Sequence, residues 1–373
     1  MGNMGTSHAR TLRSGSIPGL ALAAVADTDP LRLKDQTDVP TFTDPLALIE
    51  SPLVDAVLVA TPHYSHPDLG IRALQAGKHV LVEKPISVHK ADAERLIAAY
   101  RPESGLIFAA MFNQRTDPRY RRLKQMIDTG VLGRIQRVSW TITDWYRTEH
   151  YYQSGQWRAT WAGEGGGVLL NQCPHQLDLW QWLFGSPQTV VARCQYGRFH
   201  DIEVEDSVTA LLEYENGLQG VFTTTTGEAP GVNRLEVAGD LGLVVVENGQ
   251  LQFRRNTVSS AEFCRTSPKP FDRPPFEDVP VELEGTATQH AGILANFAEA
   301  IQGRAPLIAP AAEGAASVEL ANAMLLSSML GRAVSLPLNG AEYAQHLERL
   351  IQGSRYHSKQ AATSTAADMS GSF

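Results

Sequence analysis

Residues 56–85 read AVLVATPHYSHPDLGIRALQAGKHVLVEKP, and this stretch decides the fold of the first part of the chain. Its apolar runs Ala56–Ala60 and Val80–Val82 have strand length, and His66–Ala76 between them has the apolar spacing of a helix. The next expected elements are a helix over Lys90–Tyr100 and a strand over Leu106–Ala110. Continuously apolar strands that alternate with helices predict a parallel sheet covered on both faces, a Rossmann-type α/β fold.

Upstream of this stretch, the chain carries part of a dinucleotide-binding fingerprint. Gly2 and Gly5 have the spacing of the last two glycines of G-x-G-x-x-G. The apolar run Leu20–Ala26 ends at Asp27, about 20 residues later, where an acidic residue binds the ribose hydroxyls of NAD. Each signal alone is weak, because G-x-x-G also occurs in flexible termini and Asp often follows a strand. Together they predict a cofactor site.

The first glycine of the motif and the strand before it are absent from the sequence. That strand lies at the centre of such sheets. Losing about four buried apolar side chains would remove about 6–12 kcal/mol, against a typical total stability of about 5–15 kcal/mol. We therefore expect Met1 to be an internal residue of a longer fingerprint, and a chain that begins at Met1 to be barely stable.

Polar residues follow two strands of the predicted parallel sheet. Thr61, Pro62 and His66 follow the first strand of the opening stretch, and Glu83 and Lys84 follow the second. Ligands of such sheets bind beyond the carboxyl ends of the strands, so both segments are expected to face one crevice. Lys84 is a candidate acid, base or substrate clamp, the alternative being a solvated loop lysine.

After a linking helix over Arg119–Thr129, strands recur without helices between them. They are expected over Ile135–Thr143, Val190–Tyr196, Ser207–Tyr214, Gly220–Thr226, Leu235–Ala238, Gly242–Glu247 and Leu251–Arg254. Turn residues such as Asn216-Gly217 indicate hairpins, and thus an open, mainly antiparallel sheet in an α+β domain. Pro268–Pro280 is expected to be an extended crossing, and two helices over Gln289–Gln302 and Ala311–Gly331 to close the domain. The predicted division is 1–118, 119–357 and a disordered tail over 358–373.

A glycine-rich segment, Gly163–Gly167, precedes the second candidate part of the site. In a helix that follows it, Asn171, His175 and Asp178 would lie on one face, at i, i+4 and i+7. A buried helix whose polar groups satisfy neighbouring backbone is the alternative. Three inward polar groups are costly to bury, which favours a functional role.

Aromatic and basic residues are interleaved just before this segment. Stacking on sugar rings and bonding to hydroxyls or carboxylates suit such side chains, although an interface between subunits or domains is equally compatible. The candidate substrate-binding residues are Trp145, Arg147, Tyr152, Trp157, Arg158 and Gln172.

Composition excludes several classes of function. The chain has 373 residues, 43% of them hydrophobic, a net charge of -8 and a pI near 5.8, which argues against nucleic acid or an anionic membrane as partner. No signal peptide and no apolar run of membrane-spanning length is recognised. The three widely spaced cysteines suggest neither a metal site nor a disulfide framework and fit a reducing cytoplasm.

Taken together, these motifs resemble the Gfo/Idh/MocA oxidoreductases, a family that includes glucose-fructose oxidoreductase and the inositol dehydrogenases. The resemblance covers roughly residues 1–350. It rests on Gly2-Asn3-Met4-Gly5, Asp27, Thr61-Pro62 with His66, Glu83-Lys84-Pro85, Asn113-Gln114-Arg115, Gly130 with Leu132-Gly133, and Gly165-Gly166-Gly167 with Asn171, His175 and Asp178.

The resemblance implies hydride transfer between NAD or NADP and a hydroxyl-bearing carbon of a sugar or cyclitol, in a homodimer or homotetramer. It places Lys84 and His175 at the reacting alcohol. The cofactor contacts that it implies are Gly2, Asn3, Met4, Gly5, Asp27, Thr61, Pro62, His66, Glu83, Lys84 and Asn113. Inositol dehydrogenases usually carry aspartate where this chain has Asn171, and an amide can orient a hydroxyl but cannot ionise.

An alcohol releases hydride only as its proton leaves, so a base must lie within hydrogen-bond reach of the oxygen. We expect His175 to be that base, Lys84 a cationic clamp or relay, Asn171 an orienting group, and Asp178 a partner of His175 or of a substrate hydroxyl. Asp27 without an adjacent arginine favours NAD over NADP. Two alternatives remain: a redox-neutral, NAD-dependent glycosidase-like enzyme, and a sugar-binding protein without catalysis.

Overall fold

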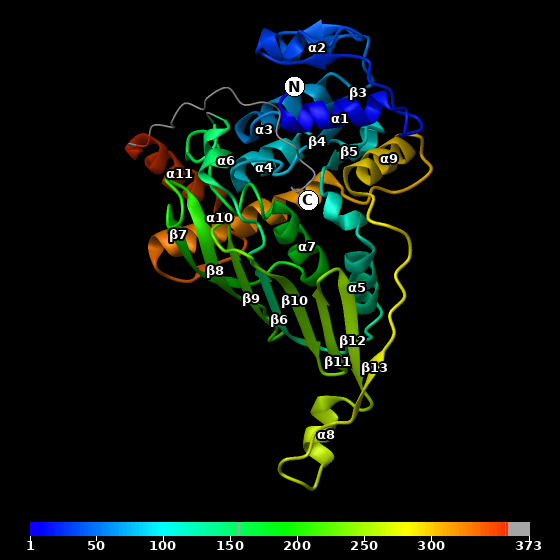
Figure 1. Ribbon diagram of the computed structural model, residues 1–373, viewed down its shortest axis with the longest axis vertical. Helices are drawn as coiled ribbons and strands as arrows, with labels where there is room; N and C mark the ends of the chain where they lie inside the picture. The colour runs from blue at the N-terminus through cyan, green and yellow to red at the C-terminus, as the bar shows by residue number, and fades with distance from the viewer. Residues whose placement is uncertain (156, 355, 357–373) are drawn as a thin grey trace.

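The computed structural model describes residues 1–155, 157–354 and 356, and the tail expected over 358–373 lies outside the described residues. Helices and short parallel strands form one part of the molecule, and a long sheet forms the other (Figure 1). No helix in the described part of the chain combines the length and apolarity needed to cross a membrane.

The first part follows the predicted alternation of strands and helices. Its elements are α1 (Asn3–Arg13), β1 (Val25–Ala26), η1 (Pro30–Leu33), β2 (Thr41–Phe42), α2 (Pro45–Glu50), β3 (Ala56–Val59), η2 (His63–Ser65), α3 (His66–Gln75), β4 (His79–Val82), α4 (Lys90–Ala98), η3 (Pro102–Ser104), β5 (Phe108–Ala110) and η4 (Asn113–Thr116). Strands β3, β4 and β5 pair in parallel in that order, with Val57 opposite Val80. The parallel sheet predicted from residues 56–110 is therefore confirmed.

The strand expected over Leu20–Ala26 is much shorter than predicted. Only Val25 and Ala26 form β1, which pairs in parallel with β2 as a separate two-stranded sheet. Within the described residues no strand pairs with the other edge of β1. An apolar run forms a ladder only where a neighbour supplies hydrogen bonds, so most of this run is not part of a strand.

The second part is built around a nine-stranded sheet. Its elements are α5 (Pro118–Asp128), β6 (Ile135–Ile142), α6 (Glu149–Gln153), α7 (Pro174–Phe184), β7 (Thr189–Tyr196), β8 (Glu205–Glu213), β9 (Gln219–Thr225), β10 (Asn233–Gly239), β11 (Gly242–Glu247), β12 (Gln250–Asn256), α8 (Ser260–Thr266), β13 (Phe276–Val279), α9 (Gln289–Ile301), η5 (Ala311–Glu313), α10 (Gly314–Leu330), β14 (Val334–Ser335) and α11 (Gly340–Gly353). The strand order is β13-β12-β11-β10-β6-β9-β8-β7-β14. Only the β6–β9 pair is parallel, so the mainly antiparallel sheet is confirmed.

Helices cover one face of this sheet, and α7 packs directly on it (Figure 1). The indole of Trp180 on α7 stacks on Trp140 at 6.5 Å and meets Phe222 edge-on at 5.9 Å. A Cβ atom at Gly220 on β9 would lie 2.5 Å from the Trp180 ring. The fit of α7 onto the sheet therefore depends on a residue without a side chain at that strand position.

Helix α9 follows the long sheet in sequence but packs with the first part. Ile293, Leu294 and Phe297 belong to the hydrophobic cluster that also contains the buried residues of β3, β4 and β5. Lys90 at the start of α4 bonds to Glu319 on α10 at 2.8 Å, which ties the two parts together. The domain boundary at residue 118 stays a prediction.

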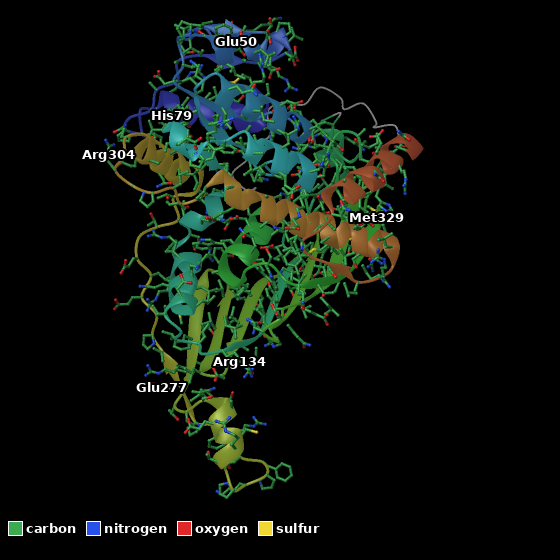
Figure 2. All side chains as sticks on the ribbon, turned by 180° about the vertical axis from the view of Figure 1, so that it is seen from behind. Glu50, His79, Arg134, Glu277, Arg304 and Met329 are labelled. Carbon is green, nitrogen blue, oxygen red and sulfur yellow. The ribbon has the colours of Figure 1, made fainter. Side chains whose placement is uncertain are left out.

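Five elements of the second part were not expected from the sequence: α6, α8, β13, β14 and α11. Strand β13 lies inside the proline-rich crossing and pairs with β12 at the edge of the sheet, where Glu277 is seen from behind (Figure 2). Met329 marks the end of α10 in the same view. Helix α11 begins where the Asn339 side chain accepts hydrogen bonds from the amides of Ala341 and Glu342.

Candidate active site

The polar stripe expected on one helix is only partly formed. Helix α7 begins at Pro174, so His175 and Asp178 lie on it while Asn171 lies three residues before its start. Proline is favoured in the first turn of a helix, where its missing N–H costs nothing. The predicted i, i+4, i+7 alignment is therefore wrong for Asn171.

The glycine-rich segment holds the backbone that leads into α7 against a buried carboxylate. The two Glu205 oxygens accept hydrogen bonds from the amides of Gly167, at 2.8 Å, and Leu169, at 3.0 Å. A Cβ atom at Gly167 would lie 2.0 Å from the Glu205 carbonyl oxygen, a distance that no side chain tolerates. Burial raises the pKa of Glu205 to about 7, although these amides favour the charged form.

Lys84 meets the second part of the molecule directly ahead of α7. Its Nζ donates a 2.8 Å hydrogen bond to the backbone carbonyl of Asn171. Burial lowers the pKa of Lys84, and the charges of Arg158 and Arg147 add to this effect while Glu83 opposes it. Lys84 is thus a half-buried side chain that joins the segment after β4 to the segment ahead of α7.

His175 is 4% exposed, and its Nδ1 is buried without a hydrogen-bond partner in the described part of the chain. Burial lowers the pKa of His175 well below the usual imidazole value, and the positive charge of Lys84 lowers it further. The side chain is therefore neutral at pH 7, with a ring nitrogen left for a ligand. Buried polar atoms are rarely left unpaired in proteins without such a reason.

The Tyr151 hydroxyl links Asn171, whose carbonyl binds Lys84, to Arg158. Its hydroxyl accepts hydrogen bonds from Arg158 Nη1 at 2.6 Å and Gln172 Nε2 at 2.9 Å, and donates to Asn171 Oδ1 at 3.1 Å. Its neighbour Tyr152, the predicted substrate contact, instead bonds to Thr226 Oγ1 at 2.8 Å and packs on His200. In a one-turn helix adjacent residues point in different directions, and Tyr151 occupies the place expected for Tyr152.

The Asn171 amide is fixed from a second side by Glu164. Asn171 Nδ2 donates to Glu164 Oε1, and the other Glu164 oxygen accepts from the Ala159 amide at 2.9 Å. Burial raises the pKa of Glu164, while Arg158, 3.8 Å away, lowers it. The Glu164 carbonyl meets His63 Nδ1 at 3.2 Å, which brings the end of β3 to the same place.

Asp178 was expected to be a partner of His175 or of a substrate hydroxyl, but its hydrogen bonds within the described residues go to Arg115 and Gln181. Its oxygens accept two hydrogen bonds from Arg115 at 2.6 and 2.7 Å, and Arg115 also contacts Glu313. Asp178 is 0% exposed and Arg115 is 1% exposed. A buried carboxylate that is occupied by a guanidinium anchors α7 to η4 and is not available to a substrate hydroxyl.

The predicted aromatic and basic residues come together at one place. The Arg158 guanidinium lies 4.4 Å from the Tyr151 ring and 4.6 Å from the Trp157 ring. The Arg147 guanidinium lies 5.1 Å from Tyr151 and 5.3 Å from Trp145. Arg147 Nε, Trp145 Nε1 and Gln172 Oε1 are buried without a partner in the described residues.

The cofactor side of the site lies at α1 and at the ends of β3 and β4. Gly2 precedes α1, and Asn3, Met4 and Gly5 form its first turn, where amides without intrahelical partners favour phosphate. Extra Cβ atoms at Gly2 and Gly5 would meet nothing closer than 3.5 Å. The Asn113 Oδ1 atom is buried without a partner, while its Nδ2 donates to Gln289 at 2.8 Å. These features fit a bound dinucleotide.

Asp27 has a neighbour that the sequence reasoning missed. Its carboxylate contacts the Met1 amino group and accepts from the Asp29 amide at 2.9 Å, and Arg32 Nη1 lies 3.8 Å from it. No arginine is adjacent to Asp27 in the sequence, but η1 turns the chain back and brings Arg32, five residues later, near its carboxylate. A cation beside Asp27 weakens the argument against a 2′-phosphate.

The remaining predicted cofactor contacts are tied to one another. Glu83 pairs with His8 on α1 at 2.6 Å. Burial would raise the pKa of Glu83, but the hydrogen bond and charge of His8 hold it at about 2. His66 contacts the carbonyls of Thr61 and Pro85 at 2.7 and 2.8 Å, which joins the segments after β3 and β4. Pro62 and Thr61 stay exposed at this edge.

Sequence reasoning missed Tyr151, Glu164, His63 and Arg115 as members of this site. Both Tyr151 and Glu164 lie in stretches that the sequence had already indicated. Tyr151 is in the aromatic and basic stretch that includes Trp157, and Glu164 lies among the glycines; these positions were the available signal. Arg115 pairs with a residue 63 positions away, and no local pattern predicts such a pair.

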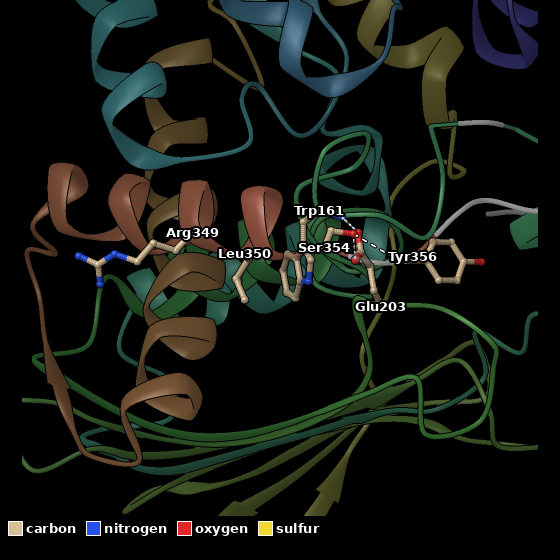
Figure 3. Close-up of a pocket in the computed structure, with 7 residues that line it drawn as sticks. Trp161, Glu203, Arg349, Leu350, Ser354 and Tyr356 are labelled. Atoms are coloured by element: carbon tan, nitrogen blue, oxygen red, sulfur yellow. Dashed lines mark hydrogen bonds between the residues drawn. The ribbon is translucent and has the colours of Figure 1, made fainter.

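A separate surface pocket of about 490 Å³ lies at the end of α11 (Figure 3). Glu203 is held there by the Trp161 amide at 2.7 Å and by Ser354 Oγ at 2.5 Å. Arg349 and Leu350 of α11 line its other side. None of the predicted site residues lines this pocket.

Known proteins were compared with this chain. Residues 1–111 match the oxidoreductase family with an NAD-binding Rossmann fold, and residues 120–245 match the GFO/IDH/MocA C-terminal domain. Inositol 2-dehydrogenase 1 of Saccharopolyspora erythraea is 36% identical over 251 residues, which are 65% of this chain and 71% of that protein. Myo-inositol 2-dehydrogenase of Thermotoga maritima is 28% identical over 260 residues, 66% of this chain and 73% of the relative.

Among solved structures, the WlbA dehydrogenase of Bordetella pertussis in complex with NADH and UDP-GlcNAcA has a similar fold. Its TM-score is 0.75 at 24% identity, and the match covers 90% of this chain and 96% of that chain. This likeness supports the fold alone. Because residues 1–111 and 120–245 match the two family models and a relative of 36% identity is covered over 71% of its length, the chain belongs to the GFO/IDH/MocA family of NAD-binding oxidoreductases.

Proposed function

We propose that this NAD(P)-dependent oxidoreductase moves a hydride between the nicotinamide and a hydroxyl-bearing carbon of a sugar or cyclitol. The two relatives described above are inositol dehydrogenases, which supports a polyhydroxylated substrate. The observation that carries the proposal is the meeting of Lys84 with the segment that leads into α7. The half-buried Lys84 side chain and the neutral imidazole of His175, whose pKa is lowered by burial and by the charge of Lys84, support the proposal.

A dinucleotide held at the first turn of α1, at Asp27 and at the ends of β3 and β4 would supply the hydride acceptor, and the residues of this chain handle the proton. The neutral His175 imidazole takes the hydroxyl proton as the carbon–hydrogen bond breaks. The Lys84 ammonium stabilises the negative charge that develops on the oxygen. This electrostatic stabilisation is stronger in a site shielded from water than in bulk solvent. Asn171 acts as an orienting group, because its amide is fixed between Tyr151 and Glu164.

Asp178 has no part in the proposed proton transfer. Its two oxygens are bonded to Arg115, so it serves to hold α7 and thereby the position of His175. We assign it as a positioning residue, in place of the catalytic role that the sequence suggested.

The test is NADH formation from a panel of inositols, sugars and glycosides, together with His175→Ala. We expect the variant to lose about 100- to 10,000-fold in turnover, the usual contribution of a positioned base. NADH binding, followed by the cofactor's fluorescence, should change little. Equal losses in turnover and cofactor binding would refute the assignment of His175, and cleavage of a glycoside without net NADH formation would indicate redox-neutral chemistry.

We further propose that the enzyme is a cytoplasmic homo-oligomer that prefers NAD. The unpaired cysteines of the described chain fit a reducing compartment. Apolar side chains such as Leu211 and Tyr196 are exposed on strands of the long sheet and suit a contact between copies. Asp27 supports NAD, although the Arg32 contact leaves NADP possible.

A further inference from the structure

The site of this enzyme carries more positive charge than a neutral sugar requires. Lys84, Arg147 and Arg158 lie close enough that both arginines lower the pKa of Lys84. Glu83 pairs with His8, while Glu164 bonds to Asn171 and the Ala159 amide and lies 3.8 Å from Arg158. Within the described residues, neither Lys84 nor Arg147 has a carboxylate at ion-pair distance. Cations gathered in a partly buried site favour a negatively charged ligand.

The two guanidinium groups are fixed in a way that leaves their edges for a ligand. Tyr151 lies under both, while Trp157 and Trp145 flank Arg158 and Arg147 respectively. An arginine that stacks on a ring directs its N–H groups sideways, the geometry that matches a planar carboxylate. Arg147 Nε is buried without a partner in the described chain, and one Arg147 Nη1 bond goes to its neighbour's carbonyl at 3.0 Å.

A second unpaired atom lies in the same cluster. Gln172 is 4% exposed; its Nε2 bonds to the Tyr151 hydroxyl, and its Oε1 has no partner within the described residues. An unpaired acceptor beside an unpaired guanidinium donor suits a ligand that carries both hydroxyls and an anionic group. A buried donor or acceptor left without a partner costs about 1–3 kcal/mol. A hydroxyl can pair with either atom, but a carboxylate forms the stronger, charge-assisted bond with the guanidinium donor.

We propose that the substrate is a sugar acid whose carboxylate is bound by Arg147 and Arg158 while its reacting hydroxyl lies at Lys84 and His175. This inference rests on the proposed function and names its substrate class. The Tyr151 hydroxyl couples the two ends, because it bonds to Arg158 and to Asn171, whose carbonyl holds Lys84. A carboxylate bound by Arg147 and Arg158 is thereby linked to the position of Lys84, where the reacting hydroxyl lies.

The experiment compares methyl glucoside with methyl glucuronide, which differ only in a hydroxymethyl group against a carboxylate at one carbon. We measure kcat/KM for NADH formation and, by calorimetry, the Kd of each probe for the NADH-loaded enzyme. The glucuronide should be preferred by about 10- to 100-fold, as expected of a charge-assisted bond. Added salt should reduce the preference.

Arg147→Gln and Arg158→Gln should each lower the ratio of glucuronide to glucoside by about tenfold or more. Arg193→Gln is the matched control, because Arg193 is exposed on β7 and should leave the ratio unchanged. Glucose 6-phosphate serves as a third probe. A preference for it over the glucuronide would overturn the carboxylate assignment.

The two proposals fail in different ways. If NADH forms equally well from both matched probes, the sugar-acid inference is wrong and the dehydrogenase function stands. If the glucuronide binds more tightly through the two arginines but no probe yields NADH, the inference stands and the proposed oxidation is wrong. If neither the glucoside nor the glucuronide binds, the sugar-acid inference is also wrong.

Discussion

Asp178→Asn should destabilise the protein by about 3–5 kcal/mol, the usual cost of removing one partner of a buried ion pair. The side chain is 0% exposed and that of Arg115 is 1% exposed, and two short hydrogen bonds join them. The amide keeps the shape but leaves the Arg115 charge buried with only one carboxylate, Glu313, which is 44% exposed. The free energy of unfolding from urea titrations measures the loss.

Glu313→Gln is the matched control and should cost no more than about 1 kcal/mol, because that carboxylate is largely solvated. A double variant, Asp178→Leu with Arg115→Met, should recover much of the stability, since it leaves no buried charge. A loss below about 1 kcal/mol for Asp178→Asn, together with abolished turnover, would refute our reasoning. Asp178 would then belong to the chemistry, as the sequence first suggested.

Three further predictions concern the segment that leads into α7. The free energy of unfolding should fall by on the order of 3 kcal/mol between about pH 4.5 and 7, because folding holds a proton on Glu205 that the unfolded chain releases; Glu205→Gln should flatten this part of a pH series of urea titrations. Gly167→Ala should lower thermal stability severely through its clash with the Glu205 carbonyl, whereas Gly353→Ala, where a Cβ atom meets nothing within 4 Å, should change Tm little. The lowered pKa of His175 predicts that kcat/KM does not decline between pH 7 and 6; a decline centred on the ordinary imidazole pKa near 6.5 would contradict its burial.

Much of the fold could be predicted because its signals are local. The strands of the parallel sheet are continuous apolar runs, and the hairpins of the long sheet carry turn residues at their ends. Helix α11 was missed, although Asn339 and Glu342 have the spacing of a helix start and were an available local signal. Strand β13 could not be predicted, because its pairing with β12 is set by the sheet and its neighbourhood is rich in proline.

Those residues of the candidate site whose positions follow from the order of strands and helices along the chain could be predicted. Lys84 follows a strand of a parallel sheet, so its position at the crevice follows from topology alone. The start of α7 was misjudged because apolar periodicity was extended backwards past Pro174, although proline itself indicated the helix start. Contacts such as Arg115 with Asp178 and Tyr151 with Arg158 depend on how distant segments pack, which no spacing encodes.

The bond from Lys84 to the second part of the molecule ends on a main-chain oxygen. Any amino acid except one that distorts the backbone presents the same oxygen at position 171. The side chain there can therefore vary while the lysine remains in place, so changes of substrate preference at residue 171 need not disturb the catalytic cation. A saturation library at this position therefore separates the two roles of residue 171. Lys84 should keep its main-chain partner in the variants, while loss of the amide that bonds to Tyr151 and Glu164 should lower turnover.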